Sequence, residues 1–412
     1  MFVADVVDLG LDTTEDRRAL IAKHDRKLGR RKRELESWDA YRRGDVPLKY
    51  MAPEIADEFG DRIAQLVINV AQMGVEAYEH RLDIDGVRLA PNADADDAEA
   101  EWWQTLDMDL VYSQVHDEAL GLGTAFTCVG VSEEDDTVPV VTAESPLQMT
   151  VDVSPLRVTR SAVKRWVEED GRTQMRTLYL PNETLHWARG SNGKWDVIDT
   201  IEHGWGRVPV YRFMNAGHLL DEAGLPVFKP VIPTYEALCK MATDMMVGGE
   251  FHALPRRWAT NVAADAFEDE HGNPIQPLQQ LIGATWNIPG VTGSADKVQV
   301  GQFDASDLKN FHESIRLLLW LAGHLMGLPQ SYTESASQNP AAEGAIKAGE
   351  IRLVKGSERK IGVFKPQWRG TWQSVMQVRN GGVMPDEARQ LSVIFRDAST
   401  PTFAQLADGT VK

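Results

Sequence analysis

Hydrophobic residues recur at helical spacing near the start of the chain, between residues 14 and 42. The stripe consists of Ile21, Leu28, Leu35, Trp38 and Tyr41. Side chains at this spacing share one face of a helix, so the pattern predicts an amphipathic helix with a strongly basic outer face. We expect this helix to end at Gly44.

Two more helices are predicted before the middle of the chain. Residues 53–74 and 98–121 carry apolar side chains at helical spacing, and residues 75–90 between them favour extended backbone. Gly121 and Gly123 are expected to end the second of these helices.

The middle of the chain changes from helical spacing to alternation of apolar and polar residues. The alternating segments are TAFTCVGV, VPVVTA, AVKRWVEE, QMRTLYL, ETLHWA and KWDVIDT. Clusters of Asp, Asn, Gly and Pro separate them, which is typical of short strands in an antiparallel sheet. GRVPVYRFMN at 206–215 closes this strand-rich region.

Two helices are then predicted on either side of a small β-rich insert. The first covers about residues 231–254, and the second runs from a cap at Asp304 or Ser306 to about residue 326. The insert between them, residues 256–304, holds the strand pattern RRWATNV, then GATWNIPG and KVQVGQF as a predicted hairpin.

A last helical pattern, residues 338–364, carries glycine at positions 344, 349, 356 and 362. Each interior glycine costs about 1 kcal/mol relative to alanine, so the four weaken the helix by roughly 4 kcal/mol. Such a penalty needs a reason. We expect Pro366 to interrupt this helix before a final helical piece, GTWQSVMQVRN.

Charge and composition limit the possible functions. The 412 residues are enough for two or three compact units and carry 61 acidic and 43 basic side chains, a net charge of −18. This balance argues against a protein that binds nucleic acid through a basic face. The charge is uneven, however, because acids dominate from Asp83 to Asp107 and bases from Gly344 to Arg379.

Neither a membrane span nor a secretion signal is expected. No segment approaches the roughly 20 apolar residues of a transmembrane helix, and the N-terminus lacks the basic-then-apolar order of a signal peptide. Cys128 and Cys239 lie over 100 residues apart in apolar surroundings, so we expect buried free thiols.

The sequence predicts no catalytic, cofactor or metal site. GLGTAF and GSNGKW lack the spacing of nucleotide-binding loops, and HExxH, CxxC and GxSxG do not occur. His186 and His203 lie near Glu183 and Glu202, which leaves an acid–base pair as a minor alternative. The acidic cluster at residues 265–271 fits a solvated turn better than a calcium loop.

Methionine and aromatic side chains mark the two helices that flank the insert. Met241, Met245 and Met246 lie on the first, and Trp320 and His324 on the second. Such stripes most often indicate ordinary helix packing. A helix that separates two units has few neighbours in its own chain, so copies of the same helix in a ring are a further possible partner.

Four segments together resemble a known family. They are WDAYRRGDVPLKY at 38–50, GRVPVYRFMN at 206–215, HLMGLPQSYT followed by QNPAAEGAIKAGEIRLVKGSERKIGVF, and, more loosely, FRDASTPTFAQLADGTVK. The chain resembles the portal proteins of tailed double-stranded DNA phages, in particular the group similar to the portal of a Bacillus siphophage and common in actinobacterial phages.

This resemblance implies an α+β portal fold that assembles as a ring, usually of twelve copies, at one capsid vertex. Double-stranded DNA would be packaged and ejected through it. The implied parts are a wing of helices and antiparallel sheet (1–228), stem helices (229–255 and 305–328), a β-rich clip (256–304), a tunnel loop (329–340), a long kinked helix (341–379) and a short crown-proximal segment (380–412).

Partners and location also follow from the resemblance. They are further copies of the chain, the large terminase subunit, a head–tail connector or adaptor protein, the major capsid protein with its scaffold, and the DNA in the channel. The protein would belong to the virion's portal vertex and pass through the host cytoplasm during assembly. No enzymatic activity is expected.

The implied parts give candidate site residues. The DNA-facing candidates are Gln338, Asn339, Lys347, Lys355 and Arg359. The candidates for stem-helix packing are Met241, Met245, Trp320 and Leu325. The candidates for a helix kink or close contact are Gly349 and Gly356, and those for the clip surface are Glu268, Asp269 and Glu270.

An acidic lumen suits a DNA channel, because a lysine-lined wall would hold the duplex in place. The acidic wall would repel the DNA phosphates within about 8 Å at physiological salt. Isolated cations can serve as loose grips on DNA, although solvated or inter-subunit salt-bridge roles fit them equally well. The alternatives are another ring-forming virion component, such as a head–tail adaptor or tail protein, and a hydrolase that uses His186 or His203.

Overall fold

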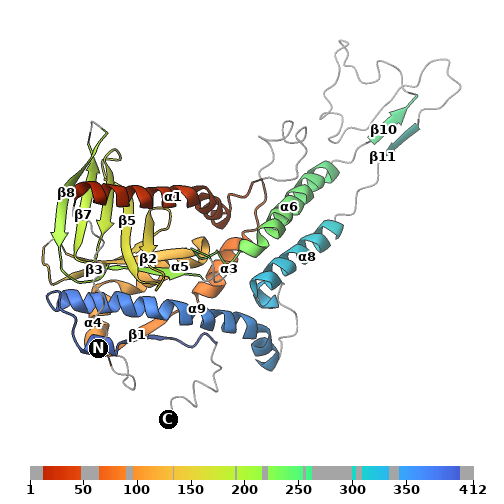
Figure 1. Cartoon of the computed structure of the whole chain (residues 1–412). Helices are drawn as coiled ribbons and strands as arrows, with labels where there is room; N and C mark the ends of the chain where they lie inside the picture. Colours follow the sequence, from red (N-terminus) through yellow and green to blue (C-terminus); the bar gives the residue numbers. More distant parts are fainter. Residues whose placement is uncertain are drawn as a thin grey trace. The chain divides into compact units, whose positions relative to one another are not determined.

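The computed structural model describes residues 13–47, 65–89, 96–132, 134–190, 193–215, 221–253, 257–261, 299–302, 309–333 and 343–399. These residues form a mixed α+β fold with antiparallel sheets (Figure 1). The chain divides into two compact units. Met1–Asp45, Asn69–Pro233 and Trp320–Lys412 form the first unit, and Val46–Ile68 and Thr234–Leu319 form the second.

The first helix, α1 (Thr14–Arg43), confirms the leading hydrophobic stripe. Thr13 and Asp16 form a capping box at its start, and Gly44 closes it with a left-handed φ of 89°. The predicted stripe residues are all buried: Ile21, Leu28, Leu35, Trp38 and Tyr41. Local spacing alone therefore predicts both the extent and the inward face of α1.

A five-stranded antiparallel sheet lies against α1 (Figure 1). Its strands follow chain order: β4 (Met149–Val153), β5 (Thr159–Val167), β6 (Gln174–Tyr179), β7 (Glu183–Arg189) and β8 (Trp195–Glu202). Ile21 packs in one cluster with Val163, Leu185 and Trp187 from the sheet. Asp25 of α1 adds ion pairs to Arg165 and Arg176.

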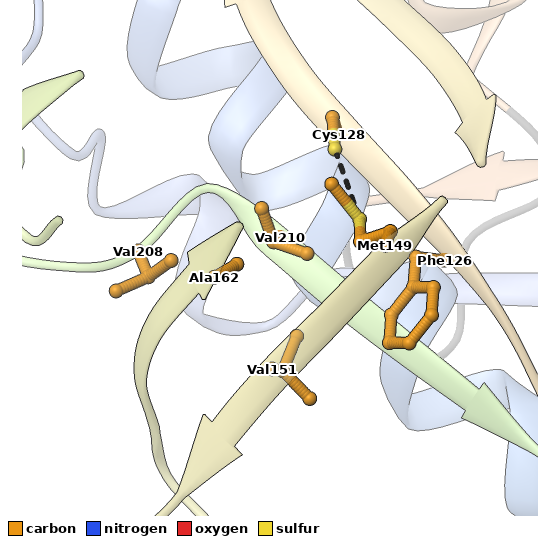
Figure 2. Close-up of a cluster of buried hydrophobic side chains, with 7 residues drawn as sticks. All are labelled: Phe126, Cys128, Met149, Val151, Ala162, Val208 and Val210. Atoms are coloured by element: carbon orange, nitrogen blue, oxygen red, sulfur yellow. Dashed lines mark hydrogen bonds between the residues drawn. The ribbon is translucent and has the colours of Figure 1, made fainter. Parts of the chain in front are cut away.

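A three-stranded sheet, in the order β3 (Pro139–Glu144), β2 (Thr124–Val131) and β9 (Val210–Met214), packs against β4 and β5 of the five-stranded sheet. Figure 2 shows the apolar cluster that links the two sheets. Cys128 of β2 faces Met149 of β4, with 3.7 Å between the sulfur atoms. Cys128 and Cys239 are both free and buried, as predicted.

The predicted helix 53–74 is wrong at residues 65–69 and confirmed at residues 70–74. Residues 65–69 are not helical, and α3 (Val70–Glu79) begins after them because the Asn69 side chain accepts a hydrogen bond from the Gln72 amide. Residues 53–64 lie outside the described residues. Within the range 75–90 that was expected to be extended, the strand is β1 (Ile84–Arg88).

The predicted helix 98–121 is two helices, α4 (Asp97–Thr105) and α5 (Met108–Leu122). The break falls at Asp107, whose φ of 48° lies in the left-handed region. Trp103 holds this corner by donating from Nε1 to Asp109 at 2.8 Å. Gly123 ends α5 as expected, with φ 78°.

The longest helix, α9 (Glu343–Arg379), runs through Pro366 without interruption, so the predicted break there is wrong. Proline in a helix interior costs about 3 kcal/mol. Burial of Trp368, Trp372 and Val375 just beyond it offsets that cost. The helix contacts β9, β2, β3 and β12.

Two strands had no sequence prediction: β4 and β12 (Ser392–Phe395). β12 pairs antiparallel with β1, so that Val87 lies opposite Val393 across about 300 residues of sequence. This pairing brings the C-terminal part of the described chain back to α3 and α4.

The second unit contains most of α6 (Ile232–Ala253) and α8 (Lys309–Met326), with two short strands between them in sequence. These strands, β10 (Arg257–Thr260) and β11 (Gln299–Gln302), pair antiparallel. KVQVGQF therefore pairs with RRWATNV. GATWNIPG, the other arm of the predicted hairpin, lies outside the described residues, as do the predicted caps Asp304 and Ser306.

Candidate functional site

Large apolar side chains of α8 are exposed to solvent in the single chain. The exposed fractions of Leu317, Trp320 and Leu325 are 62%, 39% and 42%. Trp320 stacks on His324 with ring centroids 5.1 Å apart, which leaves one indole face uncovered by the helix itself. Apolar side chains gathered in this way indicate a surface that another molecule covers.

The α6 candidates, Met241 and Met245, are half-buried. One face of this helix is covered within its own unit, where Thr243 accepts a hydrogen bond from the Leu66 amide at 3.2 Å and Cys239 is buried. Met246 beside them is 47% exposed. The methionines therefore lie at the boundary between the covered and the open face of α6.

Three of the five DNA-facing candidates lie on the exposed half of α9. Lys347, Lys355 and Arg359 are separated by multiples of four residues, so they share one face of the helix. All three are exposed, and we call them the α9 cation stripe. Lys355 pairs with Glu358 at 2.7 Å. Gln338 and Asn339 lie outside the described residues, as do the clip candidates at 268–270.

The two candidate glycines of α9 have different surroundings. A Cβ at Gly356 would lie 2.9 Å from both Cε1 and Oη of Tyr78 in α3, whereas a Cβ at Gly349 would meet nothing within 4 Å. Gly356 therefore permits a close contact within its own chain. Gly349 lies on the open part of the helix.

Tyr78 is fixed in place by further contacts. Its hydroxyl donates to the Met326 carbonyl at 2.9 Å, and the Lys360 ammonium lies 4.6 Å from the ring centroid. Lys360 also donates to Asn215 Oδ1 at 2.7 Å. Burial lowers the pKa of Lys360 to about 8 and raises the pKa of Tyr78. This cluster joins α3, α9 and the end of α8.

The other end of α9 is anchored by a buried carboxylate that the sequence did not indicate. Glu99 of α4 is 3% exposed and accepts hydrogen bonds from Trp372 Nε1 at 2.5 Å and Arg379 at 2.8 Å. Trp368 Nε1 donates to His116 at 2.9 Å. Glu99 lies in an acidic stretch, where one carboxylate cannot be told from its neighbours by spacing.

Comparison with known proteins identifies the family. Residues 22–412 match the family model for phage portal proteins of the SPP1 Gp6-like type. The chain belongs to this portal family. The resemblance seen in the sequence motifs is therefore confirmed.

Two portal proteins of mycobacterial phages are similar over most of this chain. The portal protein of Mycobacterium phage L5 is 28% identical over 360 residues, which cover 84% of this chain and 73% of the relative. The portal protein of Mycobacterium phage D29 is 28% identical over 356 residues, which cover 84% and 72%.

Membership of the portal family establishes the general role of the protein. The protein is a structural, non-enzymatic component of the phage virion that serves DNA packaging, and the family implies an oligomeric ring. The alternatives of a different virion ring component and of a hydrolase are thereby removed.

The histidine geometry agrees with a non-enzymatic portal. His186 Nδ1 lies 3.1 Å from Thr177 Oγ1, and His203 Nδ1 accepts from the Trp205 amide at 3.3 Å. Burial lowers the pKa of both, that of His203 to about 4. The Glu183 carboxylate is paired with Arg17 at 2.7 Å. These histidines are packing residues.

In the part of the chain that the structure describes, no three His, Cys, Asp or Glu side chains are grouped to hold a metal ion. None of its helices is long and apolar enough to cross a membrane.

Proposed function

We propose that twelve copies of this chain form a ring at one vertex of the capsid, around a channel for the entry and exit of double-stranded DNA. The observation that carries this proposal is the exposed apolar face of α8. An equivalent helix of a neighbouring copy is the natural cover for such a face, because cyclic rings repeat one heterologous contact.

The order of elements supports an assignment of parts. Two helices, α6 and α8, flank a pair of short antiparallel strands in the sequence. We assign residues 229–255 and 305–328 to stem helices and 256–304 to the clip. Residues 1–228 would form the wing, 329–340 the tunnel loop, 341–379 the long kinked helix and 380–412 the crown-proximal segment.

Electrostatics supports a channel that does not retain DNA. Twelve chains of charge −18 repel a duplex, and repulsion over about 8 Å at physiological salt keeps it from settling on the wall. The α9 cation stripe would form separate rings of positive charge in this acidic setting. We assign it a weak, repeated contact with phosphates.

The remaining partners are assigned by function. The large terminase subunit would dock on the clip during packaging and a head–tail connector after it. The major capsid protein and its scaffold would surround the wing. The acidic residues Glu268, Asp269 and Glu270 are the proposed contact surface of the clip.

The test is assembly of the purified chain, followed by native mass spectrometry and negative-stain imaging. The expected result is a closed ring with a central hole. Leu317→Asp places a charge on the exposed face of α8 and should abolish rings while leaving a folded monomer. Leu156→Asp is the matched control, because Leu156 is 87% exposed in a turn of the first unit. A strict monomer, or rings unaffected by Leu317→Asp, would count against the proposal.

A further inference from the structure

A small cavity lies between α1 and the strands β2, β4 and β9, within the first unit. Its apolar lining includes Phe126, Met149 and Val151, which Figure 2 shows in the cluster between the two sheets. The cavity volume is about 40 Å³, and one water needs about 10 to 15 Å³, so there is room for about three waters. One small oxyanion, such as phosphate or sulfate, needs a similar space.

Three cationic side chains line this cavity, together with a single carboxylate. Lys27 and Arg31 come from α1, where they are one helical turn apart, and Arg212 comes from β9. The carboxylate belongs to Glu222, which is exposed. None of the three cationic groups forms an ion pair within 4 Å with any residue that the structure describes. The lining therefore has a net charge of +2 in a chain that is otherwise strongly acidic.

The cationic groups are close enough to repel one another. Burial lowers the pKa of Lys27, and repulsion from Arg212 adds to this effect, although Glu222 opposes it. Burial also lowers the pKa of Arg212, and repulsion from Arg157 and Arg31 adds to it. Apolar surroundings strengthen such repulsion because the local dielectric constant is low. An anion in the cavity would relieve it.

The three cations keep hydrogen-bond donors for such an anion. Lys27 Nζ donates to the Val151 carbonyl at 3.0 Å, and Arg212 Nη1 donates to the Glu222 carbonyl at 2.9 Å. Arg31 donates to none of the described residues. A lysine has three N–H donors and an arginine has five, so most donors of the set remain available. All three side chains are half-buried, so the cavity between them is open to solvent.

Charge and size together favour a free divalent oxyanion. A chloride ion carries one charge and would leave the lining positive. A phosphate group of DNA also carries one charge, and the duplex that holds it cannot enter a recess of this size. Sulfate carries two negative charges, and phosphate at about pH 8 carries close to two, which matches the charge of the lining.

We propose that this cavity binds one phosphate-class oxyanion, held by Lys27, Arg31 and Arg212. The bound anion cancels the charge of the lining and accepts hydrogen bonds from both α1 and β9. It thereby fastens the first helix to the three-stranded sheet.

Isothermal titration calorimetry of the full chain with inorganic phosphate tests this site, at about pH 8 and at constant ionic strength set with sodium chloride. We expect one phosphate per chain, with sulfate as a competitor. Arg31→Gln should weaken binding at least about tenfold, because charge-assisted hydrogen bonds are lost. Arg33→Gln, the same change at an exposed position of α1 outside the lining, should leave the affinity unaltered.

Glu222→Gln should act in the opposite direction. It removes the carboxylate of the lining at an exposed position, so the fold is not at risk and phosphate binding should strengthen several-fold. The proposal is overturned by an absence of saturable phosphate binding, by equal effects of Arg31→Gln and Arg33→Gln, or by weaker binding to Glu222→Gln. Displacement of phosphate by a short DNA duplex at micromolar concentration would also overturn it, in favour of a surface for DNA phosphates.

Discussion

Gly356 and Gly349 allow a sharp test of how α9 packs, because they are identical residues seven positions apart on one helix. We consider Gly356→Ala and Gly349→Ala. Each change removes the entropic cost of a helical glycine, which stabilises the helix by about 1 kcal/mol. The two positions differ only in what the new methyl group meets.

At Gly349 the methyl group enters open space, so the full gain of about 1 kcal/mol is expected. At Gly356 it meets Tyr78 at 2.9 Å, closer than carbon atoms normally approach. Tyr78 cannot yield freely, since its hydroxyl is bonded to Met326 and its ring lies under Lys360. Overpacking costs about 1 to 3 kcal/mol, so the net change in unfolding free energy is about 0 to −2 kcal/mol.

Urea unfolding of the monomer, followed by circular dichroism, measures both values. We expect the midpoint of Gly349→Ala to rise and that of Gly356→Ala to stay or fall, with unchanged slopes. The difference between the variants should be about 1 to 3 kcal/mol. Equal stabilisation by both substitutions would refute the close contact between α9 and α3. Gly349→Leu, whose Cβ would meet nothing within 4 Å among the described residues, should impair ring assembly more than folding.

Three further outcomes are expected. Glu99→Ala leaves the buried Trp372 Nε1 without its acceptor and the half-buried Arg379 without its ion pair, and should lower the unfolding free energy by about 1 to 3 kcal/mol. Glu101→Ala, on the exposed side of α4, should change it by under about 0.5 kcal/mol, and urea unfolding measures both values. Replacing all three cations of the α9 cation stripe with glutamine should alter DNA packaging and retention in virions with little change in stability, and unchanged packaging would contradict the grip role. His24 is buried with a pKa lowered to about 4 by burial, so the folded state binds its proton less readily than the unfolded state. The unfolding free energy should therefore be unaffected by His24 above about pH 6.5 and should fall by about 1.4 kcal/mol per pH unit as the pH is lowered from there to about 4. Urea titrations at successive pH values measure this slope, and His24→Gln should reduce it.

Local periodicity predicted those elements whose burial is decided by their own sequence. The α1 stripe and the alternating segment of β3 fall in this class, because one repeating face fixes both the element and its orientation. β2 and β8 were also predicted as strands, but β2 is buried on both faces and β8 is exposed on both, so alternation did not predict their burial. The break at Asp107 was not predictable in this way. It depends on a left-handed aspartate rather than on a glycine or proline.

Long-range contacts explain the other differences. Pro366 stays inside α9 because Trp368 and Trp372 are buried against other elements, which no local rule can anticipate. β12 is recognisable only through its partner β1, far away in the sequence. At the site, the sequence predicted aromatic and glycine positions of interest, but only the structure separates Gly356, packed on Tyr78, from Gly349, which is open.

The proline in α9 gives this helix a mechanical property. Pro366 has no amide hydrogen, so the carbonyl of Gly362, four residues earlier, lacks its helical donor. Nothing lies within 4 Å of the place where a Gly362 side chain would begin, so that side of the turn is open, whereas Phe364 in the same turn is fully buried beside His116 and Phe213. Proline turns of this kind are where helices bend. We therefore expect a force on the first half of α9 to bend the helix at this turn toward its open Gly362 side, because Phe364 and the tryptophans beyond it are held by their packing.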